Sequence, residues 1–253
     1  MFLLLIQGLI AGVIVGFVTG SIKSWVDRFF LVILLVSMMG LPIGRAITIN
    51  LIVVGLAAVM MVLRQSDALL SVRHHWAMIV VSAVVGGVIG RLLGMAASAS
   101  ALLGVLGIYA ILVGARLVLI KPVPERESKA HPAWLAPVAF AGGILAGFLS
   151  AGGKPFKVPV YNWALGHHPM RAYALAALGV STAAWAAIGA QIAVGQSLSP
   201  ADLLLAMYEF VIITLTALGV AKFWSPKLNK IVALIVAPIL VLVGIRFLWI
   251  AWA

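Results

Sequence analysis

The stretch GFLSAGGKPFKVPVYNW, residues 147–163, interrupts a long apolar chain with a pair of glycines, two prolines and two lysines. Glycine permits a sharp turn of the backbone, and proline fits the first turn of a helix that restarts after it. We therefore predict that a membrane helix breaks near Gly152–Gly153 and resumes near Pro155. The free N–H groups and the positive dipole end of the resumed helix, together with Lys154 and Lys157, predict an anion-binding site.

The composition places this break in a membrane protein. Of 253 residues, 64% are hydrophobic and 9% are charged, and the mean hydropathy is +1.23. No water-soluble core needs so many apolar side chains. The chain has no cysteine, which excludes disulfides, thiol catalysis and thiolate metal sites. Its net charge of +11 is spread over short loops, as in polytopic membrane proteins, so we expect no nucleic-acid partner.

Ten apolar segments follow one another along the chain, five in each half. Backbone groups in hydrocarbon must be satisfied within their own segment, so we predict an all-α integral membrane protein. The second and seventh segments are too short to span comfortably, which indicates broken or re-entrant helices near the midplane. The predicted segments are 2–18, 29–41, 46–63, 76–93, 101–120, 135–149, 158–165, 172–194, 203–221 and 231–252.

The two halves resemble each other in a nearly constant register, with Lys154 lying 131 residues after Lys23 (154 − 23 = 131). Weak internal symmetry of this kind is typical of transporters, and five segments in each half give the halves opposite orientations. We therefore predict two inverted-topology repeats, residues 1–120 and 134–253, joined by a linker at 121–133. The positions that match at this offset include Gly12 with Gly143, Gly16 with Gly147, Phe17 with Phe148, and Arg91 with Lys222.

The distribution of charge orients the chain. Nine Lys or Arg residues fall on one side of the predicted topology and only Arg45 and Arg91 on the other, with Lys23 and Lys154 set aside as residues of the breaks. The positive-inside rule makes the side with nine cytoplasmic. We therefore expect a multi-pass protein of the bacterial cytoplasmic (inner) membrane, with a cytoplasmic linker and both termini outside. The nine are Arg64, Arg73, Lys121, Arg126, Lys129, Arg171, Lys222, Lys227 and Lys230.

The predicted anion site draws on the breaks of both halves. Lys23, like Lys154, follows a turn of small residues. Because ionisable residues inside a membrane tend to mark transport pathways, we assign both lysines to the substrate. The alternative is that they reach toward lipid headgroups from helix ends. Neighbouring residues assigned to the same substrate site are Lys157, Gly152, Gly153, Ser150, Thr19 and Ser21.

Other polar residues of the apolar segments allow two interpretations. Arg45 and Arg171 follow a proline in each half, and each either lines the anion route or anchors the chain at the membrane interface. Trp185 is a candidate wall for the organic body of a substrate. The remaining four either bind substrate by hydrogen bonds or join helices to one another: Asn50, Ser181, Thr182 and Gln191.

Asp27 and Glu209 are the only carboxylates that we expect near the embedded segments. Both are candidates for proton coupling, and a structural ion pair is the alternative for each. Two histidine pairs, at 74–75 and 167–168, have no cysteine or carboxylate at ligand spacing. We therefore predict no metal and no cofactor.

Residues 142–185, GGILAGFLSAGGKPFKVPVYNWALGHHPMRAYALAALGVSTAAW, resemble the second-half signature of the TauE/SafE sulfite-exporter family. Residues 8–25, GLIAGVIVGFVTGSIKSW, look like a degenerate copy. The resemblance implies a secondary carrier for sulfur-containing anions. The family's third glycine is Lys154 here, and its first-half glycine run has become GSIK, so the added cations suit an organosulfonate. The matching positions are Gly143, Gly147, Ser150, Gly152, Gly153, Val158, Pro159, Pro169, Ser181 and Thr182.

The sequence thus predicts a permease for a sulfur-containing anion, either an organosulfonate or a sulfite-like oxyanion, in contact with membrane lipids. A proton or a sodium ion is the expected coupling ion, and a homo-oligomer is left open. An anion channel and a non-catalytic membrane subunit of a larger complex are the alternatives. The chain contains neither H-E-x-x-H nor G-x-S-x-G, and no pair of catalytic carboxylates, so we expect no enzyme.

Overall fold

The computed structural model describes residues 2–22, 28–119, 131–166 and 168–252, and this part of the chain contains helices but no strand, which confirms the all-α prediction. The elements before the linker are α1 (Phe2–Ile22), α2 (Phe29–Ser37), α3 (Ile43–Arg64), α4 (Ser66–Leu70), η1 (Arg73–His75), α5 (Trp76–Ala96) and α6 (Ala99–Leu119). Those after it are η2 (Pro132–Trp134), α7 (Leu135–Leu149), α8 (Lys154–Ala164), α9 (Pro169–Ala193), α10 (Pro200–Lys222) and α11 (Pro226–Trp252).

Eight helical segments of the described chain are long and apolar enough to cross a membrane, so the chain is a multi-pass integral membrane protein. α2 and α8, with 9 and 11 residues, are too short to cross a hydrocarbon core about 30 Å thick. The prediction of two short segments is therefore confirmed. The eight spanning segments are α1, α3, α5 with η1, α6, α7 with η2, α9, α10 and α11.

Proline marks the start of the last three long helices, at Pro169, Pro200 and Pro226. Its missing N–H costs nothing at the first position of a helix, where that group has no intrahelical partner. The start of α10 is fixed further by Ser199, whose hydroxyl accepts a hydrogen bond from the N–H of Asp202 at 3.1 Å. Asp202 is thereby held in the first turn of α10, where the site described below needs it.

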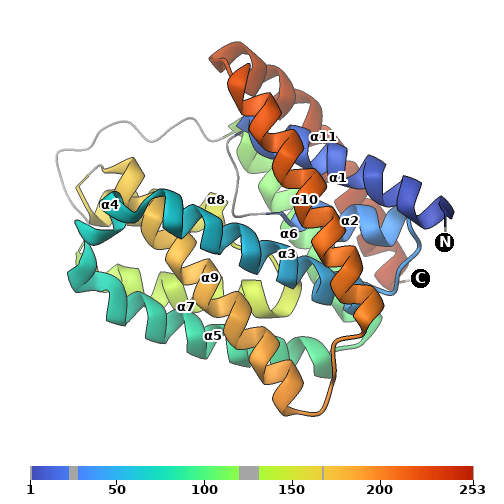
Figure 1. The fold of residues 1–253 in the computed structure, drawn as a ribbon, viewed down its shortest axis with the longest axis horizontal. Coiled ribbons are helices and arrows are strands. Elements are labelled where there is room, and N and C mark those ends of the chain that lie inside the picture. The colour runs from blue at the N-terminus through green and yellow to red at the C-terminus, as the bar shows by residue number, and fades with distance from the viewer. Residues whose placement is uncertain (1, 23–27, 120–130, 167, 253) are drawn as a thin grey trace.

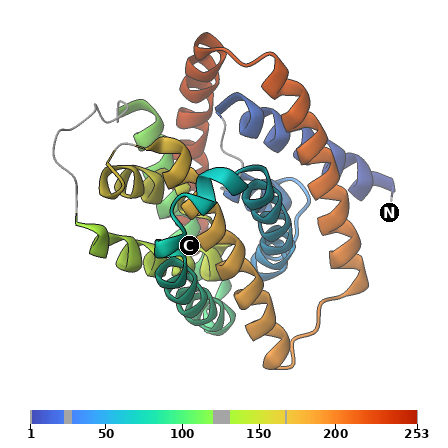
Figure 2. The same cartoon turned by 60° about the vertical axis from the view of Figure 1, so that its left-hand side comes forward.

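Helices α3 and α9 pack against each other in the middle of the molecule (Figures 1 and 2). Their most apolar windows are 72% and 61% buried, whereas the other six spans lie between 28% and 44%. The outer helices therefore present most of their apolar surface to lipid, and α3 and α9 form the core.

The contacts between helices follow the same pattern when the helices before the linker are exchanged for those after it. α1 packs along α10, and α7 packs along α5 (Figure 1); α2 lies on α3, and α8 lies on α9; α3 contacts α10, and α9 contacts α5. The counterparts in the two halves are α1 and α7, α2 and α8, α3 and α9, and α5 and α10. When every helix is replaced by its counterpart, one pair of each set becomes the other. This is the pattern that two related halves would produce, and the inverted repeat itself stays a prediction.

Glycine allows the closest of these helix pairs to meet backbone to backbone. A side-chain carbon added at Gly143 of α7 would lie 2.6 Å from the carbonyl oxygen of Ala83 in α5, and one at Gly147 would collide with Gly87. On α1, carbons added at Gly16 and Gly20 would lie 2.8 and 2.7 Å from carbonyl oxygens of α10. Small residues are what bring helices into contact in lipid, where the hydrophobic effect does not drive association between them.

Candidate anion-binding site

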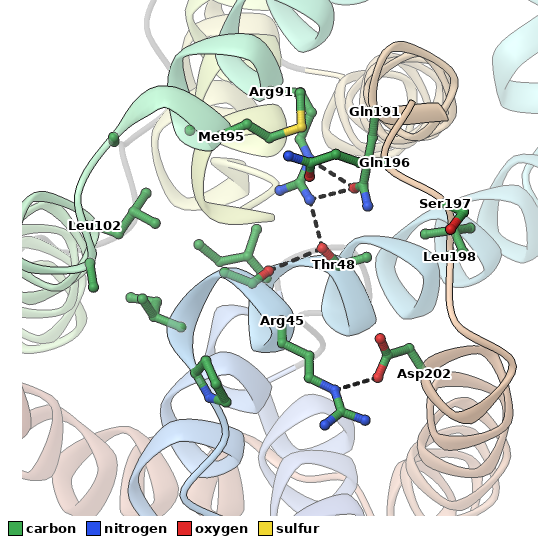
Figure 3. A pocket seen from close by; sticks show the side chains of 17 residues that line it. Arg45, Thr48, Arg91, Met95, Leu102, Gln191, Gln196, Ser197, Leu198 and Asp202 are labelled. Carbon is green, nitrogen blue, oxygen red and sulfur yellow. Dashed lines mark hydrogen bonds and ion pairs between the residues drawn. The ribbon is translucent and has the colours of Figure 1, made fainter. Parts of the chain in front are cut away.

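A cavity of about 430 Å³ lies where the ends of five helices meet (Figure 3). Its walls come from the first turns of α3, α6 and α10, the last turns of α5, and the end of α9 with the loop that follows. A cavity of this size is in the range that holds small organic ligands. The polar side chains that line it include Arg45, Thr48, Arg91, Gln191, Gln196 and Asp202.

Arg91 of α5 is the buried cation of this cavity, with 4% of its surface exposed. Its Nε donates to Oε1 of Gln191 in α9 at 3.0 Å, and its Nη2 donates to the same oxygen and, at 2.6 Å, to the hydroxyl of Thr48 in α3. Figure 3 shows the three side chains converging from three helices. Thr48 in turn donates to the carbonyl oxygen of Gly44 at 3.0 Å. The guanidinium is therefore held in one orientation.

The partners of Arg91 are all neutral, although its group carries a full positive charge. A buried charge without a charge of opposite sign costs several kcal/mol even after relaxation of its surroundings. Nη1, the third nitrogen of Arg91, has no hydrogen-bond partner among the described residues. An anion that entered the cavity would supply both the missing charge and an acceptor for this nitrogen.

An ion pair stands in the more exposed part of the cavity. Nε of Arg45 lies 2.6 Å from Oδ1 of Asp202, with 43% and 14% of the two side chains exposed (Figure 3). Arg45 is in the first turn of α3 and Asp202 in the first turn of α10, so the pair joins two helix starts. With Arg91 the lining carries two arginines and one carboxylate, which leaves a net charge of +1.

The start of α3 adds a further positive field. Ser98 and Ser199 cap the starts of α6 and α10, accepting from the N–H groups of Ala101 and Asp202 at 3.1 Å each. At the start of α3 the capping position is Pro42, whose side chain has no acceptor. The first N–H groups of α3, at 43–45 in the cavity lining, therefore lack a side-chain cap. Such groups and the helix dipole favour a bound anion.

The helix break predicted from residues 147–163 is confirmed. α7 ends at Leu149 and α8 begins at Lys154, and between them Ser150 and Gly153 adopt left-handed backbone angles, with φ of 54° and 62°. Asn50 of α3 donates to the hydroxyl and the carbonyl oxygen of Ser150 at 2.8 and 3.2 Å. This contact ties the break to the core helix. For Asn50 this contact corresponds to the second of the two roles predicted from sequence, that of joining helical segments to one another.

The cations of the break are not part of the cavity wall: Lys157 is buried in the protein and Lys154 is half-buried. Nζ of Lys154 lies 4.1 Å from the centre of the Tyr173 ring, a favourable distance for a cation over an aromatic face. Lys157 is 3% exposed and packs against Gly142. Gly152 is buried beside them. Neither lysine lines the cavity.

A second buried arginine, Arg28, stands at the start of α2. It is completely buried, and none of its three guanidinium nitrogens has a hydrogen-bond partner among the described residues. Its charge lies within electrostatic range of Tyr173, the residue whose ring Lys154 covers. The starts of the two short helices α2 and α8 thus bring cations toward one aromatic side chain.

The other residues predicted from sequence are scattered. Thr19 and Ser21 are buried near the end of α1. Ser181 is buried within α9, and Thr182 donates back to carbonyl oxygens of its own helix at 3.1 and 3.2 Å. Trp185 is 40% exposed. Predictions for Lys23 and Asp27 fall outside the described residues.

Arg45 and Arg171, which the sequence treats as counterparts, lie at different ends of the bundle. Arg171 is in the first turn of α9, whereas Gln191 of the cavity is near the end of that helix. Twenty residues of helix separate the two by about 30 Å. Of the residues assigned from sequence, the cavity therefore brings together Arg45 and Gln191 and excludes Arg171.

Three charged residues of these sites were missed or misplaced from sequence. Arg91 was counted with the loop charges, yet it is buried inside α5. Its signal was an arginine within an apolar, glycine-rich run. Asp202 lines the cavity and adds to the two carboxylates expected near the membrane segments, so the statement that only Asp27 and Glu209 lie there was wrong. Arg28, buried at the start of α2, is not among the residues assigned to the site from sequence.

Comparison with known protein families shows which family this chain matches. The family model described as "Sulfite exporter TauE/SafE" matches residues 4–247, nearly the whole chain. No curated protein and no solved structure matches.

Proposed function

The chain belongs to the sulfite exporter TauE/SafE family, and on that premise we propose that this membrane transporter is a secondary carrier of a sulfur-containing anion. The anion is an organosulfonate or a sulfite-like oxyanion. The membrane is a bacterial cytoplasmic membrane, with the linker at 121–133 inside and the termini outside. The two halves have opposite orientations, as carriers with internal symmetry commonly do.

The observation that carries this proposal is the uncompensated charge of Arg91 at the cavity. A sulfonate or sulfite group presents oxygen acceptors in a compact, negatively charged head, which matches the planar donors of a guanidinium. Gln191 and Thr48 orient Arg91 without neutralising it. A carboxylate in place of the Gln191 amide would have neutralised the guanidinium of Arg91 and left no charge for a substrate.

The size and the apolar walls of the cavity favour an anion with an organic body. Its volume is about 430 Å³, whereas one water occupies roughly 30 Å³ of liquid, so a bare oxyanion leaves most of the space to water. The side chains of Ile47, Met95, Leu102 and Leu198 line the cavity beside the polar groups. We therefore place organosulfonates before sulfite among the substrates.

Two further cations, Arg28 and Lys154, offer a second binding position for such an anion. Arg28 and Lys154 stand at the starts of two short helices, near Tyr173. In our proposal the anion first meets Arg91 in the cavity and then exchanges it for these cations as the bundle rearranges. Positive charge contributed by both halves is suited to a site reached from either face in turn.

The test is counterflow in proteoliposomes that contain unlabelled sulfoacetate, with labelled sulfoacetate outside. Wild type should exchange label, and Arg91→Ala should lose at least about tenfold in rate, since a charge-assisted hydrogen bond contributes about 1.5–3 kcal/mol. Arg73→Ala, at an exposed arginine of η1, is the matched control and should exchange like wild type.

Competition by unlabelled sulfite, sulfate, thiosulfate and taurine in the same assay would rank the substrate classes. Equal exchange by Arg91→Ala and wild type would overturn the assignment of the site. Electrical recording separates a carrier from a channel: ohmic current with a high unitary flux would replace the carrier with an anion channel.

A further inference from the structure

Glu209 is a carboxyl group buried in the middle of α10 that the anion site does not use. Its side chain is completely buried, and neither Oε1 nor Oε2 has a hydrogen-bond partner among the described residues. The one ion pair described with a carboxylate on α10 is that of Asp202, not of Glu209. Burial of a carboxylate in a membrane protein is costly and tends to mark a functional position.

The carboxyl group fits a notch in the neighbouring helix α1. A side-chain carbon added at Gly8 would lie 2.9 Å from Oε1, and one added at Gly12 would lie 2.9 Å from Oε2. The two glycines are one turn apart, so the carboxyl sits between them against bare backbone. The notch therefore has no room for another side chain that could solvate or neutralise the group.

The helices packed against Glu209 offer it no cation. α1 has no charged residue between 2 and 22, and the charges of α3 are Arg45 and Arg64, at its two ends. On α10 itself the titratable groups are Asp202, Tyr208 and Lys222, and the hydroxyl of Tyr208 donates to the carbonyl oxygen of Leu5. Without a cation or a donor, the ionised carboxylate is unfavourable in this packing and the neutral acid fits it.

Position along α10 connects the notch to the cavity. Asp202 precedes Glu209 by seven residues, which is nearly two full turns, so the two side chains lie on the same face about 10 Å apart along the axis. Asp202 lines the cavity beside Arg45. Glu209 thus lies about 10 Å further along α10 than the cavity in which we propose that the anion binds.

We propose that Glu209 is the proton-binding site that couples anion movement to the proton gradient. This rests on the proposed transport function. The carboxylate takes a proton from water on one side, forming an O–H bond that lets it close into the notch of Gly8 and Gly12. On the other side that bond breaks, the proton returns to water, and the ionised group requires α1 and α10 to part and admit water. No other reactant is consumed.

The experiment uses two assays on the same proteoliposomes. Counterflow of labelled sulfoacetate at equal pH measures anion exchange without net proton movement. Accumulation under a pH difference of one unit, with the membrane potential clamped by potassium and valinomycin, measures coupling; one proton per anion sustains about a tenfold concentration ratio.

Wild type should show both counterflow and accumulation. Glu209→Gln should keep counterflow within about twofold of wild type, while its accumulation ratio should fall to about one. Tyr208→Phe, which loses the neighbouring hydroxyl, should keep both activities. Should Glu209→Gln fail to fold, Glu209→Met fills the same space without polar atoms and serves the same test. Accumulation by either variant at the wild-type ratio would overturn the proposal.

The two proposals fail separately. Wild type that shows no counterflow contradicts the transport function itself. Wild type that shows counterflow but no response to the pH difference contradicts only the role of Glu209.

Discussion

Arg28 and Lys154 occupy corresponding places in the two halves of the chain, each at the start of the short helix that follows the first long one. Arg28 immediately precedes α2, and Lys154 is the first residue of α8. Lys154 covers the ring of Tyr173 at 4.1 Å, and Arg28 lies within electrostatic range of the same side chain. Tyr173, a half-buried residue, therefore receives positive charge from both halves.

Replacing Arg28 with methionine should stabilise the protein in the absence of ligand and weaken its anion binding. The reason is that Arg28 is buried without a hydrogen-bond partner in the described chain, and exchanging such a charge for a packed apolar group is neutral or stabilising by about 1–4 kcal/mol. Thermal unfolding in detergent with and without sulfoacetate measures both effects. Arg73→Met should change neither. A lower melting temperature with undiminished ligand stabilisation would make Arg28 a structural residue only.

Gln191→Glu should inactivate the cavity by supplying an internal anion. A carboxylate in place of the amide oxygen that Arg91 contacts would compensate the guanidinium charge and compete with substrate. We expect transport to fall at least about tenfold while the fold keeps or gains stability. Gln196→Glu, which adds the same charge at an exposed residue of the cavity, is the control and should lose less. Equal losses in the two variants would mean that general repulsion, not the bond to Arg91, is responsible.

The pair of Arg45 and Asp202 should govern how the anion enters rather than how stable the protein is. An ion pair as exposed as this one contributes about 0–1 kcal/mol to stability. Asp202→Asn makes the cavity more positive, so the apparent KM should fall at low ionic strength, and the difference from wild type should shrink in 0.5 M salt because salt screens the charge. Arg45→Ala should shift KM the other way. A KM that is independent of salt in both variants would contradict this role.

Gly147→Ala should destabilise the protein by about 1–3 kcal/mol, since a methyl group at this position collides with the backbone of Gly87 in α5. Gly189→Ala is the matched control, because it lies in the helix α9 with nothing within 4 Å of the added carbon. There alanine should leave stability unchanged or raise it by up to about 1 kcal/mol. Unfolding of both variants in the same detergent tests the difference, and equal stability would show that the α5–α7 contact tolerates separation.

The sequence predicts the breaks and the spans well because these depend on local chemistry. The Gly152–Gly153 pair, with a lysine and a proline directly after it, stops one helix and starts the next whatever surrounds it. Runs of about 20 apolar residues are helices in lipid for the same reason. The all-α class, the two short helices and the break at 150–153 therefore follow from the residues themselves.

The cavity could not be predicted in this way, because its residues come from separate helices. Arg91, Thr48 and Gln191 belong to α5, α3 and α9, and their meeting depends on how those helices pack. Near the end of its apolar run, Arg91 has the same local appearance as an arginine of a loop. It becomes a buried cation only because Thr48 of α3 and Gln191 of α9 pack against it.

The glycine contacts of α5 with α7, and of α1 with α10, have a mechanical consequence. Where main chain faces main chain, no interlocked side chains have to leave their rotamers before one helix advances past the other. Such surfaces resist compression but offer little resistance to sliding along the helix axis. If the bundle changes shape during transport, we expect the helices to slide past each other at these two contacts. The carboxyl of Glu209, held between Gly8 and Gly12, would restrain the sliding of α1 along α10.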